Sequence, residues 1–264
     1  MLSCHDHLII MNSSLEAADR REYVMVSNAE LKERAKVAFT AQRAPMIWGF
    51  AVVFAIGLIE QAPTTWVNWQ QNMAMLNNVH PANLPSSELA LAAAFLAIML
   101  TAVFFFITAS YSGMALDALD GQRVSPDDLL SRTSEIGRWA TLYIIMTVKI
   151  FLWTLLFIIP GIIAAFNYSQ AVYLMLRDPD LKPNDAIKES AKLVKGYRAD
   201  LFVLGLSFIL WILLVIVTFG LALLYVGPYM ELTFAAFHNE LYDIKHPPGQ
   251  AIATMTSDDG AVFE

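Results

Sequence analysis

The sequence has few charged residues and a single cysteine. Only 16% of its 264 residues are Asp, Glu, Lys or Arg, and 57% are hydrophobic, whereas soluble domains contain about 25% charged residues. Because the apolar residues form long uninterrupted blocks, we predict an all-α, polytopic membrane protein. Cys4 alone cannot close an intramolecular disulfide, so the fold must depend on packing.

Other absences limit the possible functions. The net charge of -7 provides no global basic field for phosphate contacts, so we expect no nucleic-acid partner. The sequence has no HExxH motif, Gly-rich phosphate loop or GxSxG elbow, so we expect neither a cofactor nor enzymatic activity. Residues 4–7 (Cys-His-Asp-His) are of types that bind metals, but the sequence has no second cluster of ligands to complete a site. We therefore expect no metal site.

Four hydrophobic blocks cover residues 45–59, 89–116, 140–176 and 201–237. The last two contain 37 residues each, and a straight helix of that length is about 55 Å long, compared with about 30 Å for the hydrocarbon core. Each of these two blocks is therefore predicted to be a hairpin, with corners at Pro160-Gly161 and at Gly220. This interpretation gives about six short spans.

The basic residues support the same count, because Lys and Arg concentrate in cytoplasmic loops. Only Lys149 lies inside a hydrophobic block, and the segment 61–88 has no Lys or Arg. The other basic residues are six in 20–43, three in 123–138, six in 177–198, and Lys245. With two hairpins, all of these share one face, and both termini are predicted to be cytoplasmic.

Similar helix-start signals precede three of the hydrophobic blocks. Ser27 and Ser125 are each followed by an acid three residues later, and Asn184 is a plausible cap in a third copy at 182–185. We therefore predict parallel repeats, each an amphipathic helix plus a hairpin. In the alternative interpretation, the copies share only what any capped hairpin has. The predicted repeats are 27–116, 117–176 and 177–242 within a membrane domain at 27–242, flanked by disordered tails at 1–26 and 243–264.

The motifs near the C-terminal ends of the predicted repeats, called exit motifs below, also match. Tyr111-Ser112, Tyr168-Ser169 and Pro228-Tyr229 come late in their blocks, which aligns Gln170 with Glu231. The first repeat has an insertion, a translocated-side loop at 61–88. Trp66, Trp69, Met73 and Leu76 share one face of a possible helix there, which is typical of the membrane interface.

Two chargeable residues lie deep in the predicted spans, Lys149 and Glu231. Unpaired charges are costly at that depth, so a Lys149–Glu231 ion pair with Asn167 and Gln170 is one hypothesis for a substrate or proton pathway. In the alternative, Lys149 extends toward the cytoplasm and Glu231 is protonated or makes an interhelical hydrogen bond.

Helix-breaking residues provide a second set of candidates. Gly227-Pro228 lies inside a predicted span, where it forms either a structural kink or a discontinuous helix of the kind that transporters use. Gly161 with Ala165 is a small-xxx-small pair suited to close helix packing.

The second half of the chain carries a specific set of motifs. They are Ile159-Pro160-Gly161-Ile162, Tyr168-Ser169, Asp178-Pro179, Lys195-Gly196, Leu206-Ser207-Phe208-Ile209 with Trp211, and Pro228-Tyr229. Over about residues 109–242 the chain resembles a bacterial family of integral membrane proteins of unknown function. One difference is at His238, where such proteins often carry a second aromatic residue directly after Phe237. The resemblance implies an inner-membrane protein of about six spans and brings no established catalytic residues.

Together these features favour a non-enzymatic membrane module that transports or senses a small or lipidic molecule, or that assists other membrane proteins. A membrane-embedded enzyme acting on lipid is an alternative, and it predicts titratable groups clustered near Asp117, Asp120, Asp178 and His238. A purely structural scaffold is another alternative, and it predicts tight packing without a polar cavity.

Overall fold

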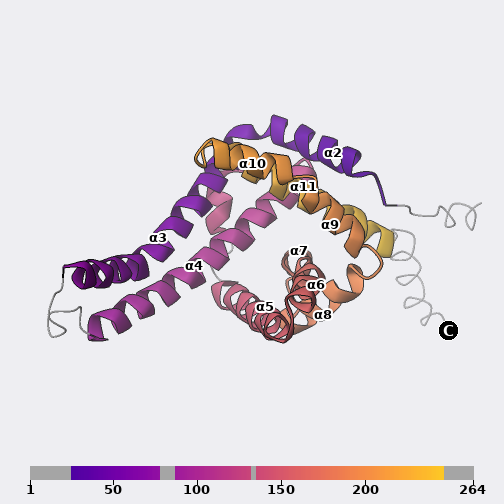
Figure 1. Cartoon of the computed structure of the whole chain (residues 1–264). Coiled ribbons are helices and arrows are strands. Elements are labelled where there is room, and N and C mark those ends of the chain that lie inside the picture. Colours follow the sequence, from indigo (N-terminus) through magenta and orange to yellow (C-terminus); the bar gives the residue numbers. More distant parts are fainter. Residues whose placement is uncertain (1–24, 78–86, 132–134, 247–264) are drawn as a thin grey trace, which may run out of the picture. The chain divides into compact units, whose positions relative to one another are not determined.

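The computed structural model describes residues 25–77, 87–131 and 135–246, and its described elements are all helices (Figure 1). They are α2 (Asn28–Ala41), α3 (Arg43–Leu76), α4 (Ser87–Leu119), η2 (Pro126–Leu130), α5 (Ile136–Leu156), α6 (Ile158–Tyr168), α7 (Ala171–Arg177), α8 (Pro183–Leu193), α9 (Arg198–Leu206), α10 (Ile209–Val217) and α11 (Leu223–Lys245). The predicted all-α class is confirmed. Because α11 reaches Lys245, the first residues of the predicted C-terminal tail are helical. Apart from a few residues, both predicted tails lie outside the described residues.

Residues Asn28–His238 form one compact unit, and the chain on both sides of them forms a second. In the second unit, the described residues include the last turns of α11, where the rings of Tyr242 and His246 stack with centroids 4.4 Å apart. The packing and the candidate site described below lie within Asn28–His238.

Five helical stretches are long and apolar enough to cross a membrane. Many of their large apolar side chains, such as Leu155, Ile159 and Leu210, are exposed on the surface of the protein. Exposed apolar surface on this scale is typical of lipid contact. The chain is therefore a multi-pass membrane protein. The five stretches are Arg43–Leu76, Glu88–Leu119, Ile136–Leu156, Ile158–Arg177 and Arg198–Val217.

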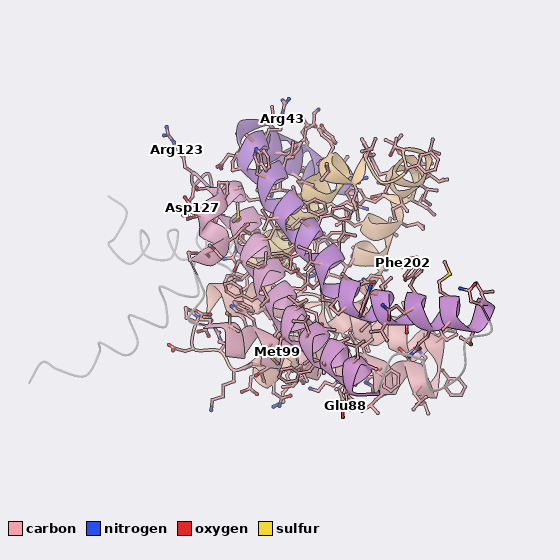
Figure 2. The ribbon with its side chains drawn as sticks, turned by 90° about the vertical axis from the view of Figure 1, so that its left-hand side faces the viewer. Arg43, Glu88, Met99, Arg123, Asp127 and Phe202 are labelled. Carbon is pink, nitrogen blue, oxygen red and sulfur yellow. The ribbon has the colours of Figure 1, made fainter. Side chains whose placement is uncertain are left out.

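Helices α3 and α4 pack side by side, with Arg43 near one end of the pair and Glu88 near the other (Figure 2). Gly49 and Gly57 of α3 allow this approach. A Cβ at either position would lie 3.1 Å from a ring carbon, of Tyr111 and Phe104 respectively. With buried Val53 between them, these residues form one face with a four-residue spacing, so small side chains set the distance between the helices.

The ribbon of α3 bends partway along its length, and its last turns leave α4 (Figure 2). The helix contains Pro63, which removes a backbone hydrogen bond and is a common cause of kinks. Beyond it, Trp66 and Trp69 are exposed, as are Met73 and Leu76. The predicted loop at 61–88 is thus helical as far as Leu76, and residues 78–86 lie outside the described residues.

The second hairpin turns at Phe157, whereas the sequence predicted a corner at Pro160-Gly161. Phe157 is extended, with φ -159° and ψ 150°, between the end of α5 and the start of α6. Pro160 therefore lies in the first turn of α6, where its missing N–H has no partner to lose. A Cβ at Gly161 would lie 2.9 Å from the Cα of Thr154, so Gly161 permits the close contact of α5 and α6 next to the corner.

The apolar stretch Arg198–Val217 is broken at Ser207 and Phe208, between α9 and α10. Lys32 of α2 donates a hydrogen bond to the Ser207 carbonyl (3.3 Å), and its Nζ lies 4.5 Å from the centroid of the Phe208 ring. Burial lowers the pKa of Lys32. The sequence did not predict this break, because neither residue is Gly or Pro.

The turn predicted at Gly220 is confirmed. Phe219 and Gly220 have φ values of 52° and 89°. The Gly220 N–H donates to the Val215 carbonyl (2.8 Å), and the Phe219 N–H donates to the Ile216 carbonyl (3.1 Å). This pair of bonds is a Schellman motif, which ends α10.

The predicted helix starts have mixed outcomes. Helix α2 begins directly after Ser27, as expected. Ser125 and Asp128 form a capping box, but it opens the short 3₁₀ helix η2, whereas the sequence predicted a long amphipathic helix. The third cap was wrong, because Lys182 is the N-cap of α8 and Pro183 is its first residue. Asn184 is therefore inside the helix and available for another contact.

The hydrophobic core draws residues from α2 to α5, η2, α7, α8 and α11. Its largest fully buried side chains include Trp139, Phe39, Phe106 and Met114. Tyr111 and Tyr173 belong to the same core cluster. The core thus fixes the segments of α4 and α7 that carry the polar residues of the site.

Candidate functional site

Glu231 lies at the centre of a polar cluster between three helices. Ser112 of α4 donates a hydrogen bond to its Oε1 (2.6 Å), and Tyr173 of α7 donates to the same oxygen (3.0 Å). The donors come from positions 119 and 58 residues away in the chain. Two hydroxyl groups therefore hold one carboxylate oxygen, which fixes the orientation of the carboxyl group.

The other carboxylate oxygen of Glu231, Oε2, accepts no hydrogen bond from the part of the chain that the structure describes. Glu231 also lines a cavity of about 330 Å³ between α6, α7, α9 and α11. One oxygen is thus held by the protein, and the other is left for a molecule in the cavity. The lining residues are Ala165, Phe166, Ser169, Gln170, Tyr173, Leu201, Glu231 and Phe234.

A second set of polar contacts connects the cavity to α8 and to the end of α11. Gln170 is buried, and its Oε1 lies 3.2 Å from Nδ1 of His238. The Gln170 N–H donates to Oγ of Ser190 (3.1 Å), which in turn donates to the Asn167 carbonyl (2.7 Å). The rings of His238 and Tyr173 stack with centroids 5.0 Å apart. These contacts hold the junction of α6 and α7, which forms one wall of the cavity.

Lys149 does not belong to this cluster. Its Nζ donates a hydrogen bond to Oδ1 of Asn184 (2.9 Å) and lies 6.0 Å from the centroid of the Tyr168 ring. The hypothesis of a Lys149–Glu231 ion pair is therefore wrong for this structure, because each residue has other partners. Lys149 reaches the first turn of α8, a contact that the alternative interpretation allows.

Gly227 and Pro228 lie in a packed contact one turn before Glu231. A Cβ at Gly227 would overlap the ring of Phe50 in α3, so this glycine lets α3 approach α11. Pro228 is inside α11 and cannot donate a hydrogen bond to the carbonyl four residues earlier. This packing favours the structural interpretation of both residues.

The acids named for the lipid-enzyme alternative are divided between two places. Asp117 and Asp120 line a smaller cavity of about 180 Å³ together with Arg177. Asp178 is part of a loop, where its carboxylate accepts a hydrogen bond from the Asp180 N–H (2.9 Å). His238 contacts Gln170 and Tyr173, residues that line the larger cavity.

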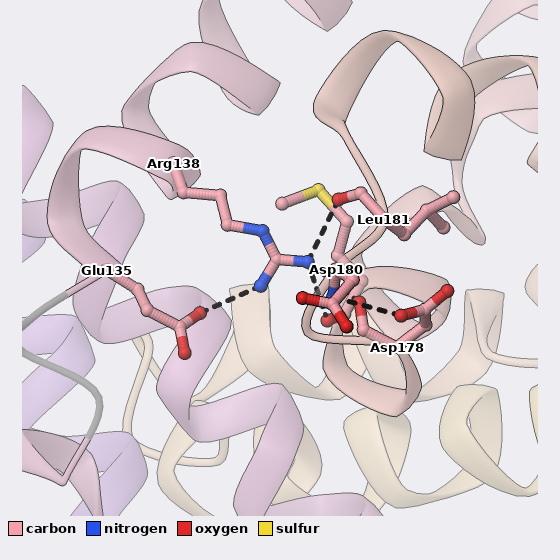
Figure 3. Close-up of polar contacts among 6 residues, drawn as sticks. Glu135, Arg138, Asp178, Asp180 and Leu181 are labelled. Carbon is pink, nitrogen blue, oxygen red and sulfur yellow. Dashed lines mark hydrogen bonds and ion pairs between the residues drawn. The ribbon is translucent and has the colours of Figure 1, made fainter.

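Arg138 joins this loop to the start of α5 (Figure 3). Its Nη2 donates to the carbonyls of Met175 (3.3 Å), Asp178 (2.8 Å) and Leu181 (3.0 Å), and its Nη1 pairs with Glu135 (2.9 Å). A cation at these carbonyls also suits the negative end of α7. Arg138 therefore fixes the direction in which the chain leaves α7 and enters α8.

The sequence identified part of the cluster and missed its donors. Glu231, Gln170 and Asn167 were predicted, whereas Ser112 was noted only as part of an exit motif and Tyr173 was not noted at all. The position of Ser112 in the Tyr111-Ser112 exit motif is the one signal that pointed to it. Among the described residues, no group of three or more His, Cys, Asp or Glu is placed to hold a metal ion. Residues 4–7 lie outside the described part.

The fold defines a multi-pass membrane protein with a carboxylate held between its helices. A family model described as "Protein of unknown function (DUF975)" matches residues 45–245, and the chain belongs to this family. The predicted membership of a family of unknown function is thereby confirmed, and the match begins nearer the N-terminus than the predicted resemblance. Comparisons with curated proteins and with solved structures found no match.

Proposed function

We propose that this protein is a non-enzymatic module of the bacterial inner membrane that binds a small or lipidic molecule beside Glu231, for transport or for sensing. The observation that carries the proposal is the arrangement of the Glu231 carboxylate. Oε1 is held by Ser112 and Tyr173, and Glu231 lines a cavity between four helices. Carboxylates in membrane segments are costly, and they commonly mark binding sites or ion pathways.

The cavity also bears on the choice between a binding module and an enzyme. Its lining combines apolar and aromatic side chains with a few polar groups, as ligand pockets commonly do. Ser169 is the lining residue that most resembles a nucleophile, but its hydroxyl donates to the Phe166 carbonyl (2.9 Å), not to a base. This arrangement favours binding over covalent catalysis.

The positions that meet in the site support the three-repeat interpretation. Counted from Tyr111, Tyr168 and Tyr229, the position two residues later is Gly113, Gln170 and Glu231. The position one residue later supplies Ser112 and Ser169. Parallel repeats around an axis along the membrane normal bring equivalent positions to the same depth. Four of the six aligned positions, Ser112, Ser169, Gln170 and Glu231, lie in the cluster or line its cavity, which supports this interpretation.

We also propose six spans, with both termini in the cytoplasm. The sixth span is the apolar first part of α11, which follows the turn at Phe219 and Gly220. Lys and Arg are absent from 61–88 and abundant in 123–138 and 177–198. This distribution favours cytoplasmic loops at 123–138 and 177–198.

The experiment compares the molecules that co-purify with three forms of the protein in mild detergent. They are the wild type, Glu231→Gln, and Glu60→Gln as a matched control. Glu60 also accepts a hydrogen bond from a hydroxyl group on α4, that of Thr101 (2.6 Å), but it does not line the cavity. Mass spectrometry should find a component that the wild type and Glu60→Gln retain and Glu231→Gln loses. An identical set in all three would contradict the proposal.

The smaller cavity favours one alternative, an enzyme acting on lipid headgroups. Asp117, Asp120 and Arg177 supply acids and a cation at the ends of α4 and α7. In that case Asp117→Asn should change the lipid composition of the membrane, while Glu231→Gln should not. A structural scaffold, the remaining alternative, predicts that neither substitution changes co-purifying molecules or lipid composition.

A further inference from the structure

We infer that the cavity beside Glu231 binds a monovalent organic cation, an amine or quaternary ammonium with small apolar substituents. This inference rests on the proposed function and names the chemical class of its ligand. It follows from the charge, the aromatic lining and the size of the cavity.

The ionisable side chains of the lining are acidic. Glu231 is the one carboxylate among the lining residues, and no Lys, Arg or His is among them. Oε2 accepts no hydrogen bond from the described chain, so it is the oxygen available to a bound cation. His238 does not line the cavity; its Nδ1 lies 3.2 Å from Oε1 of Gln170, and its ring stacks on that of Tyr173 with centroids 5.0 Å apart. A ligand in this cavity therefore meets an acceptor of negative charge.

Aromatic rings form much of the remaining lining. Phe166, Tyr173 and Phe234 come from α6, α7 and α11. Their positions are supported by other rings. Phe166 packs edge-on against Phe202 (centroids 5.9 Å apart), and Phe234 packs against Phe208 (6.1 Å). Aromatic faces attract ammonium groups, and this attraction strengthens when the site excludes water.

The size of the cavity limits the ligand. A volume of about 330 Å³ is near the lower end of small-molecule pockets, which hold about 300–1,000 Å³. A small ammonium compound with one ring or a short alkyl chain fits such a space. Ser112 and Tyr173 contribute by holding Oε1, so the carboxylate is oriented before the ligand arrives.

The test measures binding of three probes of similar shape by isothermal titration calorimetry in detergent. Benzyltrimethylammonium is the cation, neopentylbenzene is its neutral carbon analogue, and benzenesulfonate is an anion. The wild type and Glu60→Gln should bind the cation and prefer it to both other probes. Glu231→Gln should weaken cation binding by about tenfold or more, the usual range for a lost charge-assisted contact.

A second variant keeps the test decisive if Glu231→Gln does not fold. Phe234→Leu keeps an apolar side chain and removes one ring, and it should weaken binding of the cation more than binding of the neutral analogue. Equal binding of the neutral probe or the anion would overturn the cation inference and leave the proposed binding function standing. No binding of any probe would overturn the inference as well. The proposed function fails separately, when co-purifying molecules do not depend on Glu231.

Discussion

Ser112 of α4 donates a hydrogen bond to Glu231 of α11 at 2.6 Å, across 119 residues of sequence. The bond joins the first predicted repeat to the third. The carboxylate also contacts Tyr173 of the second predicted repeat, whose hydroxyl lies 3.0 Å from the same oxygen. One side chain thus receives hydrogen bonds from two other helices, α4 and α7, so its geometry depends on how α4, α7 and α11 pack together.

Ser112→Ala should destabilise the protein by about 1–3 kcal/mol, because it leaves a buried carboxylate oxygen with one donor fewer. Ser110→Ala is the matched control on the same helix. Ser110 is fully buried, and its hydroxyl has no hydrogen-bond partner among the described residues, so its loss should be neutral or stabilising. Denaturant or thermal unfolding in detergent measures both. Equal effects of the two substitutions would contradict the assigned bond.

Gly161→Ala should destabilise the protein by about 1–3 kcal/mol, because the added methyl group meets the side chain and backbone of Thr154. Gly205→Ala is the control. Gly205 lies inside α9 with no neighbouring atom within 4 Å of an added Cβ. Alanine there should be neutral or stabilise the protein by up to about 1 kcal/mol. A neutral Gly161→Ala would mean that α5 and α6 are not in close contact beside Phe157.

Arg138→Ala should cost about 2 kcal/mol, since three carbonyl groups lose a charged donor. Limited proteolysis should then cut the loop between α7 and α8 faster. Lys188→Ala removes a cation from the exposed pair with Asp185 in α8 and should change stability by less than about 0.5 kcal/mol. Arg138→Lys keeps the charge but not the planar fork, so it should recover only part of the loss. If Arg138→Lys were as stable as the wild type, the planar guanidinium group would not be needed for these contacts.

The single cysteine makes a topology test direct, because Cys4→Ser gives a cysteine-free background. Phe219→Cys should react with a membrane-impermeant maleimide in spheroplasts. Arg123→Cys and Lys188→Cys should react only after permeabilisation. If Phe219→Cys were also protected, the hairpin of α10 and α11 would not cross the membrane. The contact between Phe39 of α2, just before α3, and Tyr225 of α11, with ring centroids 5.1 Å apart, agrees with that second outcome.

The sequence predicted the carboxylate better than its surroundings. Glu231 could be identified because a charged residue stands out in an apolar block. Ser112 and Tyr173 could not be assigned to it, because hydroxyl groups are common in membrane helices and their partners depend on tertiary packing. Lys149 was given the wrong partner for the same reason, because the position of a residue along a predicted span does not fix which side of the helix faces a neighbour.

The helix boundaries show a similar limit. The turn at Gly220 was predictable, because glycine is common where a helix ends. Pro160 misled the prediction by three residues, because proline is as favourable in the first turn of a helix as it is in a corner. The break at Ser207 and Phe208 is not marked by Gly or Pro. The Ser207 carbonyl accepts a hydrogen bond from Lys32, 175 residues away, and the Ser207 hydroxyl donates to the Leu204 carbonyl, and neither partner could be assigned from the sequence.

The cavity walls formed by α6, α7 and α9 contain 11, 7 and 9 residues. Helices this short have almost no stability alone, so their neighbours hold them in place. Ligand occupancy and the folding of these walls are therefore thermodynamically linked. A compound that fills the cavity raises the unfolding temperature in proportion to the logarithm of its concentration above its dissociation constant. A screen that measures the unfolding temperature with different compounds can therefore identify the natural ligand.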